Sequence, residues 1–213
     1  MGTEDRRQPC VSGQANQQRA VDHYDVLSPG YDSRRSTWLT RRDNNVIRDL
    51  LQPSVGERAL DAACGTGVQA RWLSRRGLRV CAVDLSPRMI EQVRPHVDEV
   101  HVADIADLDL ETRFDCIVCN GALEFVPSPE RCLEALARHL RDGGRLAVIA
   151  PRRSFFGLYY HFWQRLRNRI HTHLFHRRSF EEVARRCGLR ELRVCHPFFH
   201  TIAFGWIKQS TPA

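Results

Sequence analysis

Short apolar runs alternate with amphipathic segments through most of the chain, and this alternation predicts its elements. Strand-like residues lead into Asp61, a helical pattern covers 68–76, and a second strand covers 79–83. Downstream, 114–151 holds a strand, a helix and a Gly-Gly turn into a further strand, and two last strands follow a helix that ends at Gly188. Strands separated by helices favour an α/β fold with a mostly parallel sheet and helices on both faces.

A glycine turn joins the first strand to its helix. The sequence Cys64-Gly65-Thr66-Gly67 follows Asp61, Ala70 completes a G-x-G-x-x-A pattern, and the second strand ends at Asp84. Glycines let the backbone bend tightly and approach a ligand without a Cβ collision, and an acid at the end of the second strand can accept both ribose hydroxyls. This β-α-β unit predicts a cofactor that contains a nucleoside.

Asp61 distinguishes between two classes of cofactor. A dinucleotide places its pyrophosphate at the helix N-terminus, where an acid just before the turn would repel it. S-Adenosylmethionine has no phosphate and carries a cationic amino group and a sulfonium, for which a carboxylate is a natural partner. The sequence therefore favours S-adenosylmethionine over a nicotinamide cofactor.

The stretch from Leu60 to Gly67, LDAACGTG, closely resembles motif I of the class I S-adenosylmethionine-dependent methyltransferases. This resemblance implies a Rossmann-like sheet of seven strands, mostly parallel with one antiparallel strand, and helices on both faces. It also implies the cofactor-binding residues, which we expect to be Tyr31, Asp61, Gly65, Thr66, Gly67, Asp84, Leu85, Met89, Asp104, Ile105 and Asn120.

Some of these roles have simpler alternatives. In the family, an acid after the third strand holds the adenine amino group and the next backbone N–H holds the ring, which implies Asp104 and Ile105 here; Asp104 could equally cap a turn. An aromatic residue from the N-terminal region closes over the cofactor in relatives, with Tyr31 as first choice and Tyr24 as second. Both tyrosines could instead anchor this region to the core.

We expect one methyltransferase domain over 21–213, preceded by a mobile tail over 1–20. The tail is polar and lacks apolar periodicity, 21–52 resembles the N-terminal cap of small-molecule methyltransferases, and 151–180 is a substrate-side insert. Neither end carries an apolar run of signal-peptide or membrane-span length, so a cytoplasmic protein is the simplest expectation.

The insert at 151–180 contains seven arginines, four histidines and no acid. Its apolar residues recur at helical spacing, so they predict an amphipathic helix. Tyr159, Phe162 and Trp163 are candidate substrate-binding residues. The same pattern also suits a helix that lies on an anionic membrane surface, or an ordinary helix whose apolar stripe packs on the sheet.

Charge and cysteine content add few further sites. The formal net charge is +7, yet the chain has Asn120-Gly121-Ala122-Leu123 where base-amino methyltransferases carry Asn/Asp-Pro-Pro-aromatic, so a nucleic-acid partner is disfavoured. Of the eight cysteines, Cys81, Cys116 and Cys119 fall in predicted buried strands and Cys64 falls in the glycine turn, where they act as reduced hydrophobic residues. Cys116 and Cys119 point to opposite faces of a strand, which argues against zinc.

The stretch at 122–129, ALEFVPSP, resembles the LEHVPDP-type sequence of ubiquinone-pathway O-methyltransferases, in which acids and a histidine can bind a divalent metal. Glu124 is retained, but Gly121 and Phe125 stand where further ligands would fall, so we expect no metal. Glu124 and Tyr24 join the candidate substrate-binding residues. His171, His173, His176 and His200 are candidate bases, none of which can be singled out.

The sequence as a whole predicts an S-adenosylmethionine-dependent methyltransferase that acts on oxygen or nitrogen of a small aromatic or amphipathic metabolite. Alternatives are a membrane-associated lipid or quinone methyltransferase, a nicotinamide-dependent oxidoreductase, and a cofactor-binding subunit without activity. The identity of the acceptor, the atom methylated and the oligomeric state do not follow from the sequence.

Overall fold

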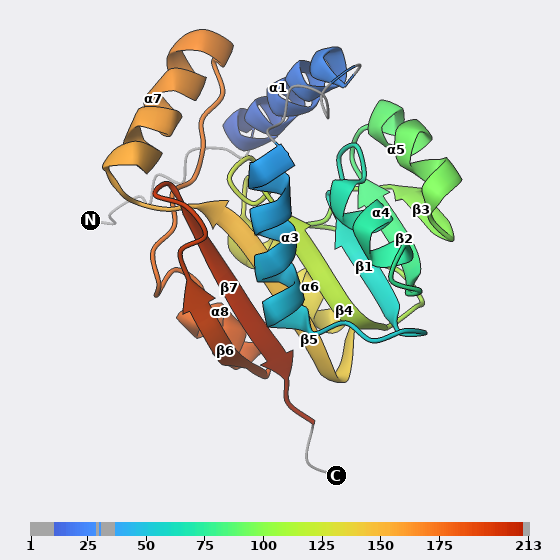
Figure 1. Cartoon of the computed structure of the whole chain (residues 1–213). Helices are drawn as coiled ribbons and strands as arrows, with labels where there is room; N and C mark the ends of the chain where they lie inside the picture. Colours follow the sequence, from blue (N-terminus) through green and yellow to red (C-terminus); the bar gives the residue numbers. More distant parts are fainter. Residues whose placement is uncertain (1–10, 29, 31–36, 211–213) are drawn as a thin grey trace, which may run out of the picture.

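The computed structural model describes residues 11–28, 30 and 37–210 (Figure 1). Seven strands form one sheet in the order β3-β2-β1-β4-β5-β7-β6. The strands are β1 (Arg58–Ala62), β2 (Arg79–Asp84), β3 (Glu99–Val102), β4 (Phe114–Asn120), β5 (Leu140–Pro151), β6 (Leu189–Cys195) and β7 (Thr201–Lys208). β7 runs antiparallel between β5 and β6, and the remaining neighbours pair in parallel. The predicted fold class is confirmed.

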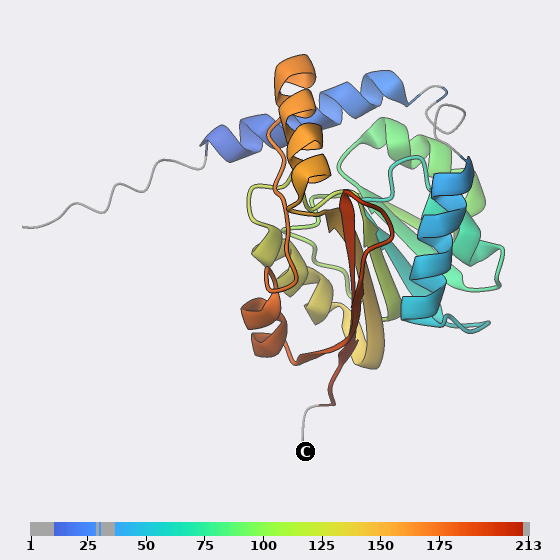
Figure 2. The ribbon, with the colours of Figure 1, turned by 60° about the vertical axis from the view of Figure 1, so that its left-hand side comes forward.

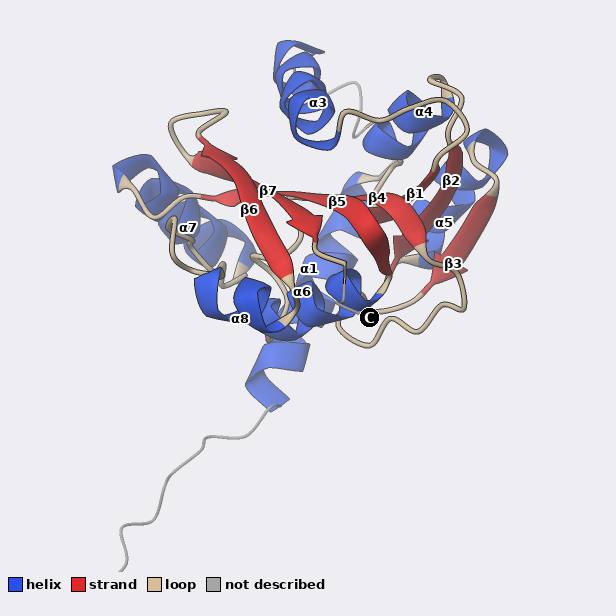
Figure 3. Ribbon diagram, turned by 90° about the horizontal axis from the view of Figure 1, so that it is seen from below, coloured by secondary structure: helices blue, strands red, loops and turns tan. Residues whose placement is uncertain are grey.

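Helices cover both faces of the sheet, which Figure 3 shows from below. They are α1 (Val11–Leu27), α3 (Thr37–Leu51), α4 (Val68–Ser74), α5 (Pro87–Val93), the 3-10 helix η1 (Arg94–His96), α6 (Pro129–Arg138), α7 (Phe155–Asn168) and α8 (Glu181–Arg186). Buried residues of α3, α4 and α5 pack on one face, and those of α6 and α8 pack on the other. Successive β4 residues alternate between the two cores, with Cys116 and Val118 in one and Ile117 and Cys119 in the other, because strand side chains alternate in direction.

The chain changes direction across the sheet at β1. β2 and β3 extend from one side of β1, whereas β4 pairs with its other side. In open parallel sheets, ligands bind at such a switch point, outside the carboxyl ends of the strands. This edge carries the cleft described below.

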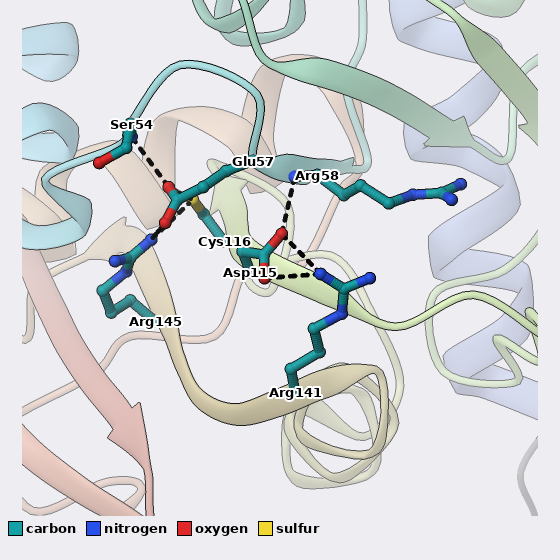
Figure 4. A network of polar contacts seen from close by, with 7 residues as sticks. All are labelled: Ser54, Glu57, Arg58, Asp115, Cys116, Arg141 and Arg145. Carbon is teal, nitrogen blue, oxygen red and sulfur yellow. Dashed lines mark hydrogen bonds and ion pairs between the residues drawn. The ribbon is translucent and has the colours of Figure 1, made fainter.

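At the other end of the sheet, where β1 and β4 begin, charged side chains connect the strands (Figure 4). Glu57 Oε1 accepts a hydrogen bond from Arg145 Nη2 at 2.6 Å, which joins the start of β1 to β5. Asp115 Oδ2 accepts the backbone N–H of Arg58 at 2.8 Å, and both Asp115 oxygens accept from Arg141 Nη1. The network thus ties β1, β4 and β5 together at the end of the sheet away from the cleft.

The first helix corrects one expectation. Residues 11–20, predicted as part of a mobile tail, form the first half of α1, and Gln17 and Ala20 are buried. The prediction failed because α1 has almost no apolar periodicity and is held largely by polar side chains. Residues 1–10 lie outside the described residues.

The cysteines behave as expected. The seven in the described part of the chain are free thiols, and Cys81, Cys116 and Cys119 are buried in strands. Burial raises the pKa of Cys81 and of Cys116 to about 12, so both remain protonated and unreactive at neutral pH. Separately, no described helix has the length and apolar character needed to cross a bilayer.

Candidate functional site

A cleft opens at the carboxyl ends of β1, β2 and β4, and its empty space, including the part open to solvent, is about 950 Å³. Helix α1 lies across the same end of the sheet (Figures 1 and 2). Nine of the predicted site residues border the cleft: Tyr24, Gly65, Thr66, Asp84, Leu85, Met89, Asp104, Ile105 and Asn120.

Two glycines shape the turn for different reasons. Gly65 and Gly67 both have positive φ, of 54° and 79°. A Cβ at Gly65 would meet no atom within 4 Å, whereas one at Gly67 would overlap the side chain of Val93 in α5. Gly65 therefore opens the turn toward the cleft, and Gly67 permits close packing of the turn on α5. Gly67 does not border the cleft, although we expected it to contact the cofactor.

Asp61 lies beneath the turn. Its side chain is buried, and its Oδ2 accepts the backbone N–H of Ala70 in the first turns of α4 at 2.7 Å. Burial raises the pKa of Asp61 to about 7, and the nearby charge of Asp84 adds to the effect. We expected Asp61 to meet the cofactor directly, but it is not among the residues that border the cleft. In this position it braces the turn and contributes negative potential from below.

Asp84 borders the cleft at the end of β2 and organises two neighbouring backbone segments. Its Oδ2 accepts the N–H of Gly65 at 2.8 Å, and its Oδ1 accepts the N–H of Ser86 at 2.9 Å. Burial still raises its pKa, because desolvation outweighs these hydrogen bonds. A carboxylate has about four acceptor sites, so Asp84 keeps the capacity to accept a hydrogen bond from a ligand.

Asp104 faces Gln17 across the cleft. Its Oδ1 accepts the N–H of Ala106 at 2.8 Å, and its Oδ2 accepts the Gln17 side-chain amide at 2.9 Å. Gln17 also borders the cleft, and sequence reasoning missed it because it placed this residue in the tail. No signal in the sequence marks Gln17, since it is one of three glutamines within 14–18 and has other polar residues beside it.

Two more contacts hold α1 beside the cleft. Asp25 Oδ1 accepts a hydrogen bond from the Ser86 hydroxyl, and the ring of Tyr24 packs edge-on against Phe125 at 5.6 Å between centroids. Tyr24 thus borders the cleft and also anchors α1, and its closure over the cofactor stays a prediction. Tyr31, our first choice for the covering aromatic residue, lies outside the described residues.

The cleft is acidic. The ionisable side chains that line it are Asp84 and Asp104 together with the thiol of Cys64 and the phenol of Tyr24, and none of the described lining residues is lysine, arginine or histidine. A diphosphate would meet two carboxylates without a compensating cation, whereas a ligand with positive charge would be stabilised.

A family model described as a methyltransferase domain matches residues 35–194. The chain belongs to this methyltransferase family. The matched region contains the glycine turn, Asp84, Asp104 and the strands β1 to β5 with most of β6, so it includes most of the cleft. Helix α1 lies outside it.

Relatives of this methyltransferase agree with the family match. A ubiquinone biosynthesis O-methyltransferase of Xylella fastidiosa is 38% identical over 110 residues, covering 48% of this chain and 45% of that protein. One from Alkalilimnicola ehrlichii is 36% identical over 108 residues, with 46% and 43% covered. The matched region thus covers less than half the length of each of these curated relatives.

Solved structures share the fold at low sequence identity. The N-methyltransferase NodS of Bradyrhizobium japonicum, in complex with S-adenosyl-l-homocysteine, has a TM-score of 0.71 at 14% identity, covering 92% of this chain and 100% of that chain. Magnesium protoporphyrin IX methyltransferase of Synechocystis with bound SAM has a TM-score of 0.69 at 14% identity, covering 91% and 97%. This likeness supports the fold of the methyltransferase.

Glu124 is a buried acid behind the cleft wall. A Cβ placed on Gly121, which borders the cleft, would have Glu124 Oε1 as its only neighbour within 4 Å, at 3.8 Å. Glu124 Oε2 has no hydrogen-bond partner among the described residues, and burial raises the pKa of Glu124 to about 8. The carboxyl is therefore largely protonated at neutral pH. It does not itself border the cleft.

Among the described residues, no group of potential metal ligands includes Glu124. The group of three that these residues do contain is Cys81, Glu99 and His101, none of which borders the cleft. A guanidinium nitrogen of Arg58 lies 3.8 Å from Glu99, which disfavours a cation at that place. The expectation of a metal-independent site stays a prediction.

The remaining substrate-side candidates lie away from the cleft. Tyr159, Phe162 and Trp163 are exposed on α7 and do not border it, contrary to our expectation. The four candidate bases do not border it either; they are His171, His173, His176 and His200. One of them helps to hold α1: the backbone of His171 forms two hydrogen bonds with the side chain of Asn16 in that helix.

Proposed function

We propose that this protein is an S-adenosylmethionine-dependent methyltransferase that transfers a methyl group to oxygen or nitrogen of a small aromatic or amphipathic metabolite. One observation carries the proposal: the cleft at the switch point of the sheet is lined by Asp84 and Asp104 and by no described basic side chain. A cationic nucleoside fits this lining, and a dinucleotide does not.

The residues present suit S-adenosylmethionine. Asp84 keeps acceptor capacity for a ribose hydroxyl, and the open side of Gly65 leaves room for a ligand against the backbone. Asp104 would accept the adenine amino group, and the backbone N–H of Ile105 would donate to the ring. When bound, the cofactor supplies a methyl group on a positively charged sulfur. The carboxylates would stabilise that charge.

The protein's main task in methyl transfer is orientation. The acceptor atom must lie in line with the carbon–sulfur bond, and holding two reactants in this way can lower a barrier by about 7–11 kcal/mol. Asn120 and Gly121 at the end of β4 line the part of the cleft where the reaction would occur. Helix α1 excludes water from above through Ala20, Val21 and Tyr24, which all border the cleft.

Glu124 is our candidate for handling a proton of the acceptor. A phenol or carboxylic acid must lose its proton before or during attack, whereas an amine must only be neutral. The Glu124 carboxyl lies behind Gly121, and its Oε2 has no partner among the described residues, so its ionised form, which predominates only above pH about 8, could accept this proton through a small shift of the wall. The name O-methyltransferase of the curated relatives supports an oxygen acceptor.

Free thiols support a reducing compartment such as the cytoplasm, since the seven described cysteines form no disulfide. The protein would then meet a soluble metabolite there.

Calorimetry with S-adenosylmethionine, S-adenosylhomocysteine and NADH tests the proposal. We expect the first two to bind and to raise the melting temperature, because a ligand of the native state stabilises it. Preferential binding of NADH would refute the proposal and favour an oxidoreductase. Incubation with a panel of phenols and amines, followed by mass spectrometry for added methyl groups, then separates an enzyme from a subunit that binds the cofactor without turnover.

A further inference from the structure

Helix α7 turns its apolar side to the solvent. Phe155, Tyr159 and Leu166 are 80%, 67% and 83% exposed, so the stripe to which they belong does not pack on the sheet, which was one of its possible roles. The polar residue Gln164 is only 3% exposed, and Gly157 is the other buried residue of the helix. The helix is therefore amphipathic in the opposite sense to a helix that covers a core.

Packing on the inner side fixes this orientation. A Cβ at Gly157 would overlap the carbonyl oxygen of Arg152, so the helix approaches the preceding backbone there. His161 Nδ1 lies 2.9 Å from the carbonyl oxygen of Thr172 and 3.0 Å from its hydroxyl. Gln164 Oε1 accepts from the side chain of Asn168 at 2.6 Å. Polar contacts thus occupy the inner side and leave the apolar side outward.

The exposed residues form one continuous face. At about 100° per residue, seven apolar side chains cover roughly 160° of the helix circumference, with Arg165 at one border and Arg167 at the other. Phe199, on the loop between β6 and β7, extends the face through its ring contact with Phe156 at 5.7 Å. We define the α7 face as Phe155, Phe156, Leu158, Tyr159, Phe162, Trp163, Leu166 and Phe199, all of them exposed.

The surroundings of the α7 face are positively charged. Arg153, Arg165, Arg167 and Arg169 are exposed, and none of them forms an ion pair with a carboxylate of the described residues. The sequence has no acid from residue 143 to residue 180. An apolar strip bordered by unpaired arginines calls for a partner that is apolar inside and negatively charged at its surface.

We propose that the α7 face docks the protein on the surface of an anionic lipid bilayer, with the aromatic side chains among the acyl chains and the arginines at the phosphates. Amphipathic helices bind membranes in this way, and tryptophan and tyrosine prefer the interface. A second copy of the chain is a poorer partner, because it would bring like-charged arginines together. The docking does not depend on the proposed methyl transfer.

The α7 face lies at the same end of the sheet as the cleft. Figures 1 and 2 show α7 and α1 side by side above the carboxyl ends of the strands. The segment after α7 contacts α1 directly, since Ile170 packs with Ala20 and Phe125 and His171 pairs with Asn16. Docking therefore places the bilayer beside the helix that covers the cleft.

Vesicle flotation of the full chain tests the proposal, with vesicles of phosphatidylcholine alone and of phosphatidylcholine with phosphatidylglycerol. We expect binding to the anionic vesicles, at least about ten-fold weaker binding to the neutral ones, and a decline with salt, because charge attraction is screened over about 8–10 Å. Equal binding to both vesicles, or no binding to either, would overturn the proposal.

Two pairs of variants localise the contact. Phe155→Ser with Leu166→Ser should reduce binding by about ten-fold or more, while Val55→Ser with Val102→Ser, which removes exposed valines elsewhere, should not. Arg165→Glu with Arg167→Glu should also abolish binding, whereas Arg75→Glu with Arg88→Glu changes the net charge equally and should retain most of it. If either control variant loses as much vesicle binding as the α7 variant with which it is compared, the assignment to α7 is refuted.

Two further measurements keep the test sharp. Gel filtration of the wild-type chain and of Phe155→Ser with Leu166→Ser should show the same size; a dimer that only the wild type forms would assign the face to a second copy instead. Far-ultraviolet circular dichroism should show that each variant is folded. A variant that fails to fold is replaced by Phe162→Gln, a milder change on the same face.

Discussion

The side-chain amide of Gln17 donates a hydrogen bond to Oδ2 of Asp104 at 2.9 Å, across 87 positions of the sequence. This contact joins α1 to the carboxylate that we propose holds the adenine amino group. Together with the contact between Asp25 and Ser86, it holds α1 over the cleft. We therefore expect α1 to move when a nucleoside enters or leaves the cleft.

Removing this contact should speed up cofactor release. Hydrogen bonds to charged groups contribute about 1.5–3 kcal/mol, so Gln17→Ala should raise the dissociation rate of S-adenosylhomocysteine by about ten-fold or more. Stopped-flow displacement measures the rate. Gln18→Ala is the matched control, because Gln18 donates to Asp22 of the same helix and does not border the cleft. Equal rates for Gln17→Ala and the wild type would show that α1 does not gate the cleft.

Asp84→Asn should weaken cofactor binding by about ten- to a hundred-fold. An amide keeps one acceptor oxygen, but its NH₂ group cannot accept a ribose hydroxyl and would oppose a backbone N–H. Isothermal titration calorimetry gives the affinity. Asp98→Asn is the control, since Asp98 accepts the N–H of Val80 at the other end of β2 and is remote from the cleft. If both variants bind like the wild type, Asp84 is not the ribose acceptor.

Glu124 should make stability fall as pH rises. Burial raises its pKa from the ordinary value of 4.5 to about 8 in the folded protein, so the unfolded chain loses this proton first. Its contribution to the unfolding free energy therefore declines between pH about 4.5 and 8 and is constant above, by at most about 5 kcal/mol at about 1.4 kcal/mol per pKa unit.

Urea unfolding of the wild type and of Glu124→Gln at pH 5, 7 and 8.5 measures this effect. The free energy of unfolding should decline less with pH in Glu124→Gln, because the amide does not ionise. Asp61, whose pKa is raised to about 7, contributes its own decline to both proteins and cancels in the comparison. Parallel curves would mean that Glu124 is already ionised in the folded protein.

Methyl transfer should not require a divalent metal. Gly121 and Phe125 offer no ligand atom beside Glu124, and one carboxylate rarely holds a metal on its own. Turnover of an accepted substrate should therefore survive dialysis against EDTA. Loss of turnover with EDTA, and its return with magnesium, would contradict this prediction.

The charged network at the far end of the sheet should matter for stability and not for binding. Arg145→Ala removes the contact between Arg145 and Glu57, and both of these side chains are 22% exposed. The substitution should lower the unfolding free energy by about 1–3 kcal/mol. Arg178→Ala breaks a far more exposed ion pair with Glu181 and should cost under about 1 kcal/mol. Cofactor affinity should be the same in both. A change in affinity with Arg145→Ala would show coupling between the two ends of the sheet.

Local sequence patterns were sufficient for the strands and for the part of the cleft that they position. The carboxyl ends of β1, β2 and β4 meet at one edge because parallel strands point the same way, so Asp84 and Asn120 could be placed beside the glycine turn from order alone. The antiparallel β7 was expected through the family resemblance, and the register of β5 with β7 confirms it.

Tertiary packing decided what local patterns could not. Asp61 lies under the turn and not in the cleft because its oxygen meets the N–H of Ala70, nine residues away. Gln17 became a site residue only because α1 crosses the sheet to reach Asp104. An apolar stripe indicates an amphipathic helix but not which way the helix faces; for α7, the close approach of Gly157 to Arg152 and the contact of His161 with Thr172 occupy the inner side and leave the stripe outward.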